Sequence, residues 1–309
     1  MAEGQMQAAT RPMPTEPGIL AFLARCDAFY PVDAVNGTIE QQRGWYDALC
    51  AAFSPALPAG LVKTDGQIGA VPIRRYRPAA LRTGRHLLYL HGGGFVVGSL
   101  ESHDAICAEI AEGVGAELTA VDYRLAPEHI WPSQTDDCYT VLKSLLAEGH
   151  EVVLIGDSAG GNLAAGVAVR ALRDGLKGVV AQALIYPALG GDLETGSYEE
   201  MGEAPGLTTA DVRYYRDILK APDDPVAHAL RIADVRGLPP AYITTAHFDP
   251  LRDDGALFAA RLAAAGIEVW YRDEPQMVHA WLRARHMSEG AAAGFRALVT
   301  AISHFAGSS

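Results

Sequence analysis

Short apolar runs alternate along the chain with segments whose apolar positions recur at helical spacing. The runs predict buried strands at residues 85–90, 118–123, 152–155, 179–186, 241–246 and 267–271. The intervening segments predict helices at residues 102–112, 135–147, 163–169, 253–265 and 288–305. Strands that alternate with helices in this way indicate the α/β class, with a mostly parallel central sheet covered by helices on both faces.

The beginning of the chain does not follow this alternation. Residues 1–18 are polar and rich in proline, and they predict no element. Apolar residues at helical spacing predict helices within residues 19–53. Residues 61–63 and 71–77 predict a hairpin, with the Asp65-Gly66 pair as its turn.

A second interruption covers residues 188–235, where only residues 209–219 predict a helix. Half of the net charge of −12 lies near this interruption, because residues 190–224 hold nine acidic and three basic side chains. We interpret the segment as a solvated surface insertion. The negative charge gives no electrostatic reason to expect nucleic acid or an anionic membrane as a partner.

Composition limits the class of protein further. The chain has 309 residues, of which 49% are hydrophobic, enough for one large α/β domain with additions. No run approaches the roughly 20 apolar residues that a membrane-spanning helix needs, and the N-terminal segment lacks the pattern of a secretory signal. The four cysteines are scattered without a C-x-x-C motif. This predicts free thiols in a reducing compartment, and therefore a cytoplasmic protein.

The sequence Gly-Asp-Ser-Ala-Gly at residues 156–160 follows the apolar run 152–155 directly, and a helical pattern follows it. This is a G-x-S-x-G motif in the strand–turn–helix context that makes it a nucleophile elbow. Ser158 is therefore the candidate nucleophile. The start of the following helix directs unpaired N–H groups at negative charge that develops beside the serine.

A serine nucleophile needs a base and an acid that orients the base, and in this motif they follow in the order acid, then histidine. Asp249 comes just after the predicted strand 241–246, and His279 comes after the strand 267–271. Carboxyl ends of parallel strands meet at one edge of the sheet, so the sequence predicts a triad of Ser158, Asp249 and His279.

A glycine-rich loop, His91-Gly92-Gly93-Gly94-Phe95, follows the first buried strand. A tetrahedral intermediate needs two or three N–H donors, and glycines let the backbone approach an oxyanion closely. The loop predicts an oxyanion hole formed from Gly92, Gly93 and Gly94, completed by the N–H of Ala159.

Four motifs together resemble the bacterial hormone-sensitive-lipase-like esterases (family IV). They are His91-Gly92-Gly93-Gly94-Phe95, Asp122-Tyr123-Arg124-Leu125-Ala126-Pro127-Glu128, Gly156-Asp157-Ser158-Ala159-Gly160-Gly161 and Asp249-Pro250-Leu251-Arg252-Asp253. The resemblance extends from about residue 61 to the end of the chain. It implies an α/β-hydrolase fold and a serine carboxylesterase that hydrolyses short- to medium-chain esters through an acyl-enzyme intermediate.

The resemblance also implies how the chain is divided. Residues 61–187 and 236–309 would form the catalytic core, and residues 1–60 and 188–235 would form a helical cap. Gly93, Gly94 and Ala159 would be the main oxyanion donors, with Gly92 shaping the loop. The implied partner is a small-molecule ester, and a homodimer formed along an edge strand is compatible with the family. No metal or organic cofactor is implied.

One position departs from the family pattern, which usually has His-Gly-Phe where this chain has His279-Ala280-Trp281. The β-carbon of Ala280 and the larger ring of Trp281 would narrow the acyl side of the pocket, which predicts a preference for short acyl chains. Phe95 and Leu207 are further candidates for the pocket wall.

Other classes fit the sequence less well. The glycine clusters do not match G-x-G-x-x-G or the P-loop, and the chain lacks H-E-x-x-H and paired metal ligands. Two alternatives keep the same fold. One is an acyltransferase or amidase that uses the same triad, and the other is a catalytically silent ligand-binding homologue.

Overall fold

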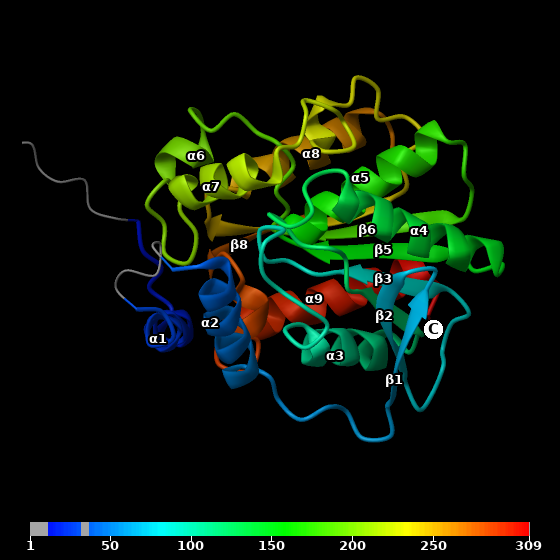
Figure 1. Ribbon diagram of the computed structural model, residues 1–309, viewed down its shortest axis with the longest axis horizontal. Helices are drawn as coiled ribbons and strands as arrows, with labels where there is room; N and C mark the ends of the chain where they lie inside the picture. The colour runs from blue at the N-terminus through cyan, green and yellow to red at the C-terminus, as the bar shows by residue number, and fades with distance from the viewer. Residues whose placement is uncertain (1–11, 32–36, 309) are drawn as a thin grey trace, which may run out of the picture.

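The computed structural model describes residues 12–31 and 37–308, which fold around one eight-stranded sheet (Figure 1). The strands lie in the order β1-β2-β4-β3-β5-β6-β7-β8. The pairings from β4 to β8 are parallel, whereas β1–β2 and β2–β4 are antiparallel. The predicted α/β class with a mostly parallel sheet is thus confirmed.

The strands are β1 (Val62–Ile68), β2 (Val71–Arg77), β3 (His86–Leu90), β4 (Leu118–Val121), β5 (Val152–Asp157), β6 (Val179–Ile185), β7 (Ala241–Phe248) and β8 (Val269–Val278). The α-helices are α1 (Pro17–Asp27), α2 (Ile39–Ala52), α3 (Asp104–Val114), α4 (Ser133–Ala147), α5 (Ala159–Arg173), α6 (Ser197–Glu200), α7 (Thr209–Leu219), α8 (Arg252–Ala264) and α9 (Glu289–Ala306). Two 3₁₀ turns are η2 (Ala229–Arg231) and η3 (Trp281–Ala284).

Both faces of the sheet are buried, which explains why the central strands are apolar along their whole length. Alternate side chains of β3 enter different cores, because strand residues point to opposite faces. Leu87 and Tyr89 pack in the core that includes α3 and α9, while Leu88 and Leu90 pack in the core that includes α4, α5 and α8.

The N-terminal helices form two elements, α1 and α2. Thr38 begins α2 with a capping box, in which its hydroxyl accepts from the Gln41 N–H and the Gln41 side chain accepts from the Thr38 N–H. The prediction that residues 1–18 form no element is wrong from Pro17 onward, where α1 begins. Residues 1–11 of that prediction lie outside the described residues.

The predicted hairpin has its turn in the wrong place. Strand β1 continues through Asp65-Gly66 and pairs with β2 up to Ile68. The chain reverses at Gly69, whose φ of 60° suits a tight turn. Asp65 belongs to the strand because its carboxylate accepts two hydrogen bonds from Arg74 on β2.

Strand β8 is longer than the sequence predicted. It pairs with β7 across a local irregularity and ends at Val278 instead of residue 271. His279 therefore follows the end of the strand at once. Helices α1, α2, α6 and α7 lie beyond the carboxyl ends of the parallel strands, at the same end of the molecule (Figure 1).

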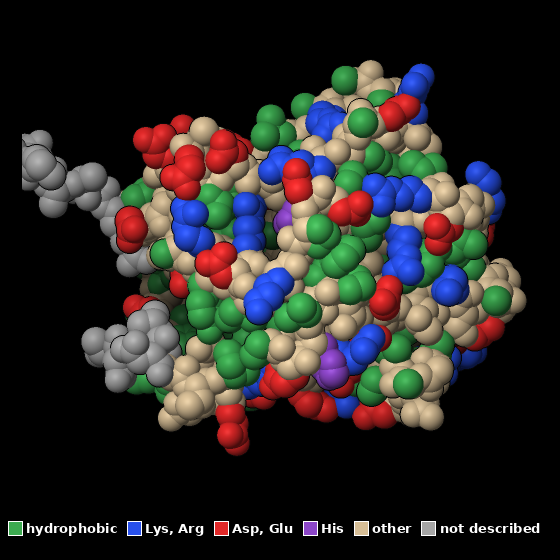
Figure 2. All heavy atoms as spheres, turned by 45° about the horizontal axis from the view of Figure 1, so that its top comes forward, with side chains coloured by type: hydrophobic (Ala, Val, Ile, Leu, Met, Phe, Trp, Pro, Cys, Tyr) green, Lys and Arg blue, Asp and Glu red, His purple; other side chains and the backbone are tan. Residues whose placement is uncertain are grey.

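The surface over α6 and α7 carries acidic side chains (Figure 2). Glu199, Glu200 and Glu203 are exposed there, in agreement with a solvated insertion. Within the described ranges, no helix combines the length and the hydropathy that crossing a bilayer would require.

Candidate active site

Ser158 lies in a strained turn between β5 and α5. Its φ of 55° and ψ of −118° are unusual for a residue other than glycine. The turn needs the flanking glycines because of close backbone contacts. A β-carbon at Gly160 would lie 1.9 Å from the carbonyl oxygen of Leu90, and one at Gly156 would lie 2.1 Å from the Gly160 oxygen.

The structure brings together the three residues expected to form the triad. The Nε2 atom of His279 lies 2.8 Å from the hydroxyl oxygen of Ser158, and its Nδ1 atom lies 2.7 Å from Oδ2 of Asp249. Asp249 is fully buried and its Oδ1 accepts the N–H of Leu251, while His279 is 8% exposed. Both partners of the serine are thus held away from water.

These contacts determine the tautomer of the histidine. A carboxylate only accepts hydrogen bonds, so the proton of neutral His279 belongs on Nδ1, where it is donated to Asp249. Nε2 then accepts from the Ser158 hydroxyl and is placed to remove its proton. The arrangement matches the roles of nucleophile, base and orienting acid.

Three of the four expected oxyanion donors line the cavity beside Ser158, namely Gly93, Gly94 and Ala159. The N–H groups of Gly93 and Gly94 have no acceptor among the residues that the structure describes. Ala159 is the first residue of α5, where backbone N–H groups have no partner within the helix. Donors of this kind can stabilise a developing oxyanion.

Gly92 does not fit the donor role that the glycine motif suggested, and its contacts agree with the loop-shaping role that the family resemblance implied. Its N–H donates to Oδ1 of Asp157 at 2.9 Å, so it is already satisfied. A β-carbon at Gly92 would lie 2.5 Å from the same carboxylate. The residue therefore fixes the start of the loop, and the unpaired N–H groups available to an oxyanion are those of the residues that follow it.

A buried network supports the glycine loop from behind. The Tyr123 hydroxyl donates to the carbonyl oxygen of His91, and the two rings stack with centroids 4.2 Å apart. Burial lowers the pKa of His91 to about 3, so its ring is neutral. The N–H of Ala126 donates to the carbonyl oxygen of Phe95 at the other end of the loop.

The site opens into a cavity of about 470 Å³, in the size range of small-molecule sites. Phe95 and Leu207 line it, as expected. Its wall comes both from the N-terminal helices and from the segment around α7. Within the described chain, no three His, Cys, Asp or Glu side chains are grouped as metal ligands would be.

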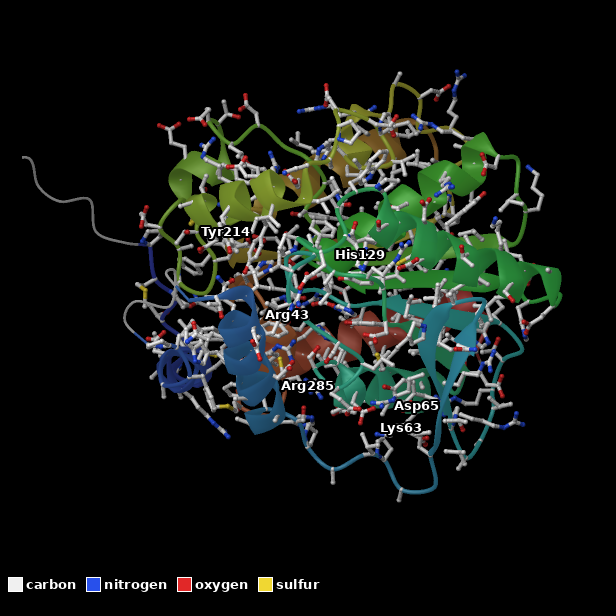
Figure 3. All side chains as sticks on the ribbon, viewed as in Figure 1. Arg43, Lys63, Asp65, His129, Tyr214 and Arg285 are labelled. Carbon is white, nitrogen blue, oxygen red and sulfur yellow. The ribbon has the colours of Figure 1, made fainter. Side chains whose placement is uncertain are left out.

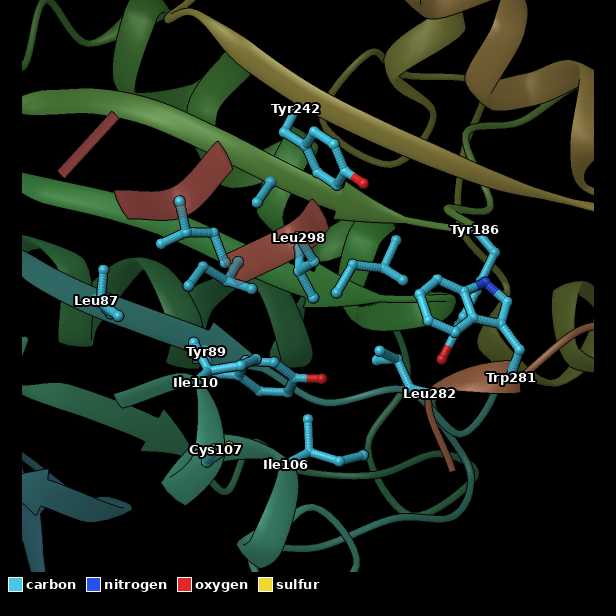
Figure 4. Packing of buried hydrophobic residues seen from close by; sticks show 14 of the residues in the cluster. Leu87, Tyr89, Ile106, Cys107, Ile110, Tyr186, Tyr242, Trp281, Leu282 and Leu298 are labelled. Atoms are coloured by element: carbon cyan, nitrogen blue, oxygen red, sulfur yellow. The ribbon is translucent and has the colours of Figure 1, made fainter. Parts of the chain in front are cut away.

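Trp281 does not line the cavity, contrary to expectation. Its side chain is 0% exposed and lies in the core, edge-on to Tyr186 (Figure 4). The backbone of the neighbouring residue Ala280 has a left-handed conformation. This conformation directs the following 3₁₀ segment so that the indole enters the core instead of the pocket. Tyr186 also contacts the ring of His279, and the centroids of these two rings are 4.8 Å apart.

Ala280 lines the cavity with a φ of 62°, a conformation that favours glycine. We expect Ala280→Gly to raise the free energy of unfolding by roughly 0.5–1 kcal/mol, because the relieved left-handed strain exceeds the entropy lost by glycine. Calorimetric unfolding measures this change. Ala260→Gly on the exposed face of α8 is the matched control and should cost about 1 kcal/mol. Equal destabilisation by both variants would contradict the strain argument.

Two arginines near the site had no signal in the sequence. Arg43 on α2 is labelled in Figure 3. It donates to the carbonyl oxygens of Val96 and Ala126, and to both carboxylate oxygens of Glu128. Arg283 on η3 is buried and lines the cavity. Their partners lie far away along the chain, so no local pattern reveals them.

Comparisons with known proteins agree with this geometry. A family model described as the alpha/beta hydrolase fold matches residues 87–283. The chain is 39% identical to carboxylesterase NlhH of Mycobacterium tuberculosis over 69% of this chain and 71% of that protein. It is 32% identical to an ethyl acetate hydrolase of Pseudomonas putida over 78% and 80% of the two chains. A solved ester hydrolase from the Lake Arreo metagenome superposes with a TM-score of 0.84 at 28% identity, over 94% and 99% of the chains.

The fold, the elbow and the serine–histidine–aspartate arrangement define the class as a serine hydrolase with an α/β-hydrolase fold. Within this class, the chain belongs to the hormone-sensitive-lipase-like esterases of family IV.

Proposed function

We propose that this carboxylic ester hydrolase is a serine carboxylesterase that acts on short- to medium-chain esters through an acyl-enzyme intermediate. The observation that carries the proposal is the 2.8 Å contact between Ser158 Oγ and His279 Nε2 on the wall of a cavity. Relatives named as a carboxylesterase, an esterase and an ethyl acetate hydrolase support it.

The reaction would proceed in two halves. The Ser158 oxygen attacks the ester carbonyl while His279 removes its proton, and the N–H groups of Gly93, Gly94 and Ala159 stabilise the oxyanion. His279 then donates the proton to the alcohol that leaves. Water activated by the same histidine releases the acid and restores the free serine.

The proposal includes the division of the chain. Residues 61–187 and 236–309 would be the catalytic core, and residues 1–60 and 188–235 the cap. Support comes from the cavity wall, to which α1, α2 and α7 all contribute side chains. A cytoplasmic location and a homodimer also belong to the proposal, and the free state of all four cysteines supports the former.

Hydrolysis of p-nitrophenyl esters with acyl chains of two to sixteen carbons tests the proposal. We expect kcat/KM to be highest for short chains, because the β-carbon of Ala280 occupies part of the cavity wall. Ser158→Ala should abolish the activity on every ester. A rate that rises beyond about eight carbons would contradict the short-chain preference. Absence of hydrolysis by the folded wild-type protein would contradict the esterase function itself.

A further inference from the structure

Arg283 has a position that the esterase mechanism does not require. It belongs to η3, only four residues after the base His279, and its side chain contributes to the wall of the cavity that contains Ser158. The residue is 6% exposed. A guanidinium is therefore buried at the substrate site.

The direct contacts of this guanidinium are all with neutral groups. Nη1 donates to the carbonyl oxygen of Ser102 at 2.9 Å, and Nη2 donates to the hydroxyl of Tyr46 at 2.9 Å. Nη2 also lies 3.3 Å from Nε2 of His103, whose pKa is lowered by burial. The Nε–H has no acceptor, and no carboxylate oxygen lies within 4 Å, among the residues that the structure describes.

The other two buried arginines behave differently. Arg74 forms ion pairs with three carboxylates, which belong to Asp65, Glu101 and Asp104. Arg285, two residues after Arg283 and labelled in Figure 3, donates to both oxygens of Glu109. Of the buried arginines in the described chain, Arg283 is the one that lacks a carboxylate partner.

Asp157 is a carboxylate close to this guanidinium, because it lies beside the same Nε2 atom of His103 that Arg283 contacts. Its Oδ2 lies 3.4 Å from Nε2 of that histidine. Asp157 also lines the cavity, and its Oδ1 accepts from the Tyr89 hydroxyl and the Gly92 N–H, which hold the carboxylate in place without an ion pair to Arg283 in the described structure. Two other acids reach the cavity wall. Asp211 accepts from Thr208, and Asp27 lies on the exposed part of α1.

Burial of a cation without a directly bound anion costs free energy. A carboxylate that reaches this guanidinium would form charge-assisted hydrogen bonds in a site shielded from water. We propose that Arg283 recognises a carboxylate on the substrate, so that the preferred esters carry an anionic group on the arm that points toward α1 and α2. This inference rests on the proposed esterase function and specifies its substrate class.

The surroundings of Arg283 agree with an arm of this kind. Phe22, Leu23 and Leu49 line the same cavity and supply an apolar path, while Tyr46 adds a hydroxyl beside the guanidinium. An aliphatic arm that ends in a carboxylate matches an apolar path with a cation beside it.

Two ester series test the proposal and identify the arm. Monomethyl esters of dicarboxylic acids place the carboxylate on the acyl side, and O-acetyl esters of ω-hydroxy acids place it on the alcohol side. Each ester is paired with a neutral ester of equal length. We expect the wild-type protein to prefer the anionic member of at least one pair about tenfold or more in kcat/KM. Arg283→Gln should remove this preference, because it lowers kcat/KM about tenfold or more further for the anionic ester than for its neutral partner.

The control is Arg285→Gln, because Arg285 is equally buried but does not line the cavity. It should lower stability and leave the ratio between anionic and neutral esters unchanged. If Arg283→Gln does not fold, inhibition of the wild-type protein provides the test, and an aliphatic carboxylate should inhibit more strongly than the alcohol of equal length.

Equal rates for anionic and neutral esters in both series, together with equal inhibition by the carboxylate and the alcohol, would overturn the role of Arg283. Such a result would leave the esterase function intact, because the neutral esters would still be hydrolysed. Failure to hydrolyse any ester would instead remove the proposed function on which this inference depends.

Discussion

Ser158→Ala is expected to lower kcat for a short p-nitrophenyl ester by about 10⁴- to 10⁶-fold, with little change in substrate affinity. The variant loses the attacking oxygen, while the glycine loop and the cavity remain. The serine hydroxyl forms one hydrogen bond in the described structure, to His279, so the fold should be retained. Steady-state kinetics on highly purified protein, with circular dichroism as a check of folding, measures both effects.

The matched variant is His279→Ala, which should cause a loss of similar size because the serine then has no base. The double variant should be no slower than either single variant, since both residues act in the same step. Multiplicative losses in the double variant would contradict a shared role. Activity of Ser158→Ala above about 1% of wild type would contradict the identity of the nucleophile.

Asp157→Ala is expected to reduce the free energy of unfolding by about 3–5 kcal/mol, the usual result of breaking a buried ionic network. Asp157 is buried, and its carboxylate binds the Tyr89 hydroxyl and the Gly92 N–H. Removal leaves that N–H unpaired and releases the start of the oxyanion loop. A misplacement of about 1 Å in such a loop can reduce the rate by about 100-fold, so kcat should fall as well.

The protonation state of Asp157 determines the pH range over which its carboxylate contributes to the free energy of unfolding. Burial opposes ionisation, but the neighbouring His103 and Tyr89 favour the charged form more strongly and hold the pKa of the carboxyl below its usual value of 3.8. A carboxyl whose pKa is lower in the folded than in the unfolded protein stabilises the folded state at every pH above its unfolded-state pKa. This stabilisation is lost as the pH falls through the folded-state pKa. The difference between wild type and Asp157→Ala should therefore be constant from pH 5 to 8.

Urea unfolding measures the loss of stability, and Tyr89→Phe is the matched control. It removes one hydrogen bond to the same charged carboxylate and should cost about 1.5–3 kcal/mol, less than Asp157→Ala, without a large change in kcat. If Asp157→Ala were as stable as Tyr89→Phe, the carboxylate would not be the centre of the network.

Much of the fold and the approach of Ser158, Asp249 and His279 could be predicted from the sequence for a physical reason. Each of the three residues comes directly after a strand of the parallel sheet, and the carboxyl ends of such strands meet at one edge. The nucleophile elbow can also be recognised from a short sequence motif, because the close backbone contacts of the turn require glycine on both sides of Ser158. These features depend on short stretches of chain.

The features that sequence analysis missed depend on distant partners. The direction of the Gly92 N–H is fixed by Asp157, which lies 65 residues further along the chain. The orientation of Trp281 follows from the left-handed Ala280 and from packing against Tyr186. Arg283 is an isolated arginine in the sequence, and its unusual environment exists only after α2, α3 and η3 have packed together.

The bonds of Arg43 have a consequence for access to the site. One side chain on α2 binds the backbone at Val96, just after the glycine loop, and at Ala126, whose N–H donates to the last residue of that loop, Phe95. Any displacement of α2 that widens the passage to Ser158 must therefore break these bonds or pull the loop with it. In the proposed esterase, we therefore expect the position of α2 to affect both the entry of substrate and the geometry of the glycine loop.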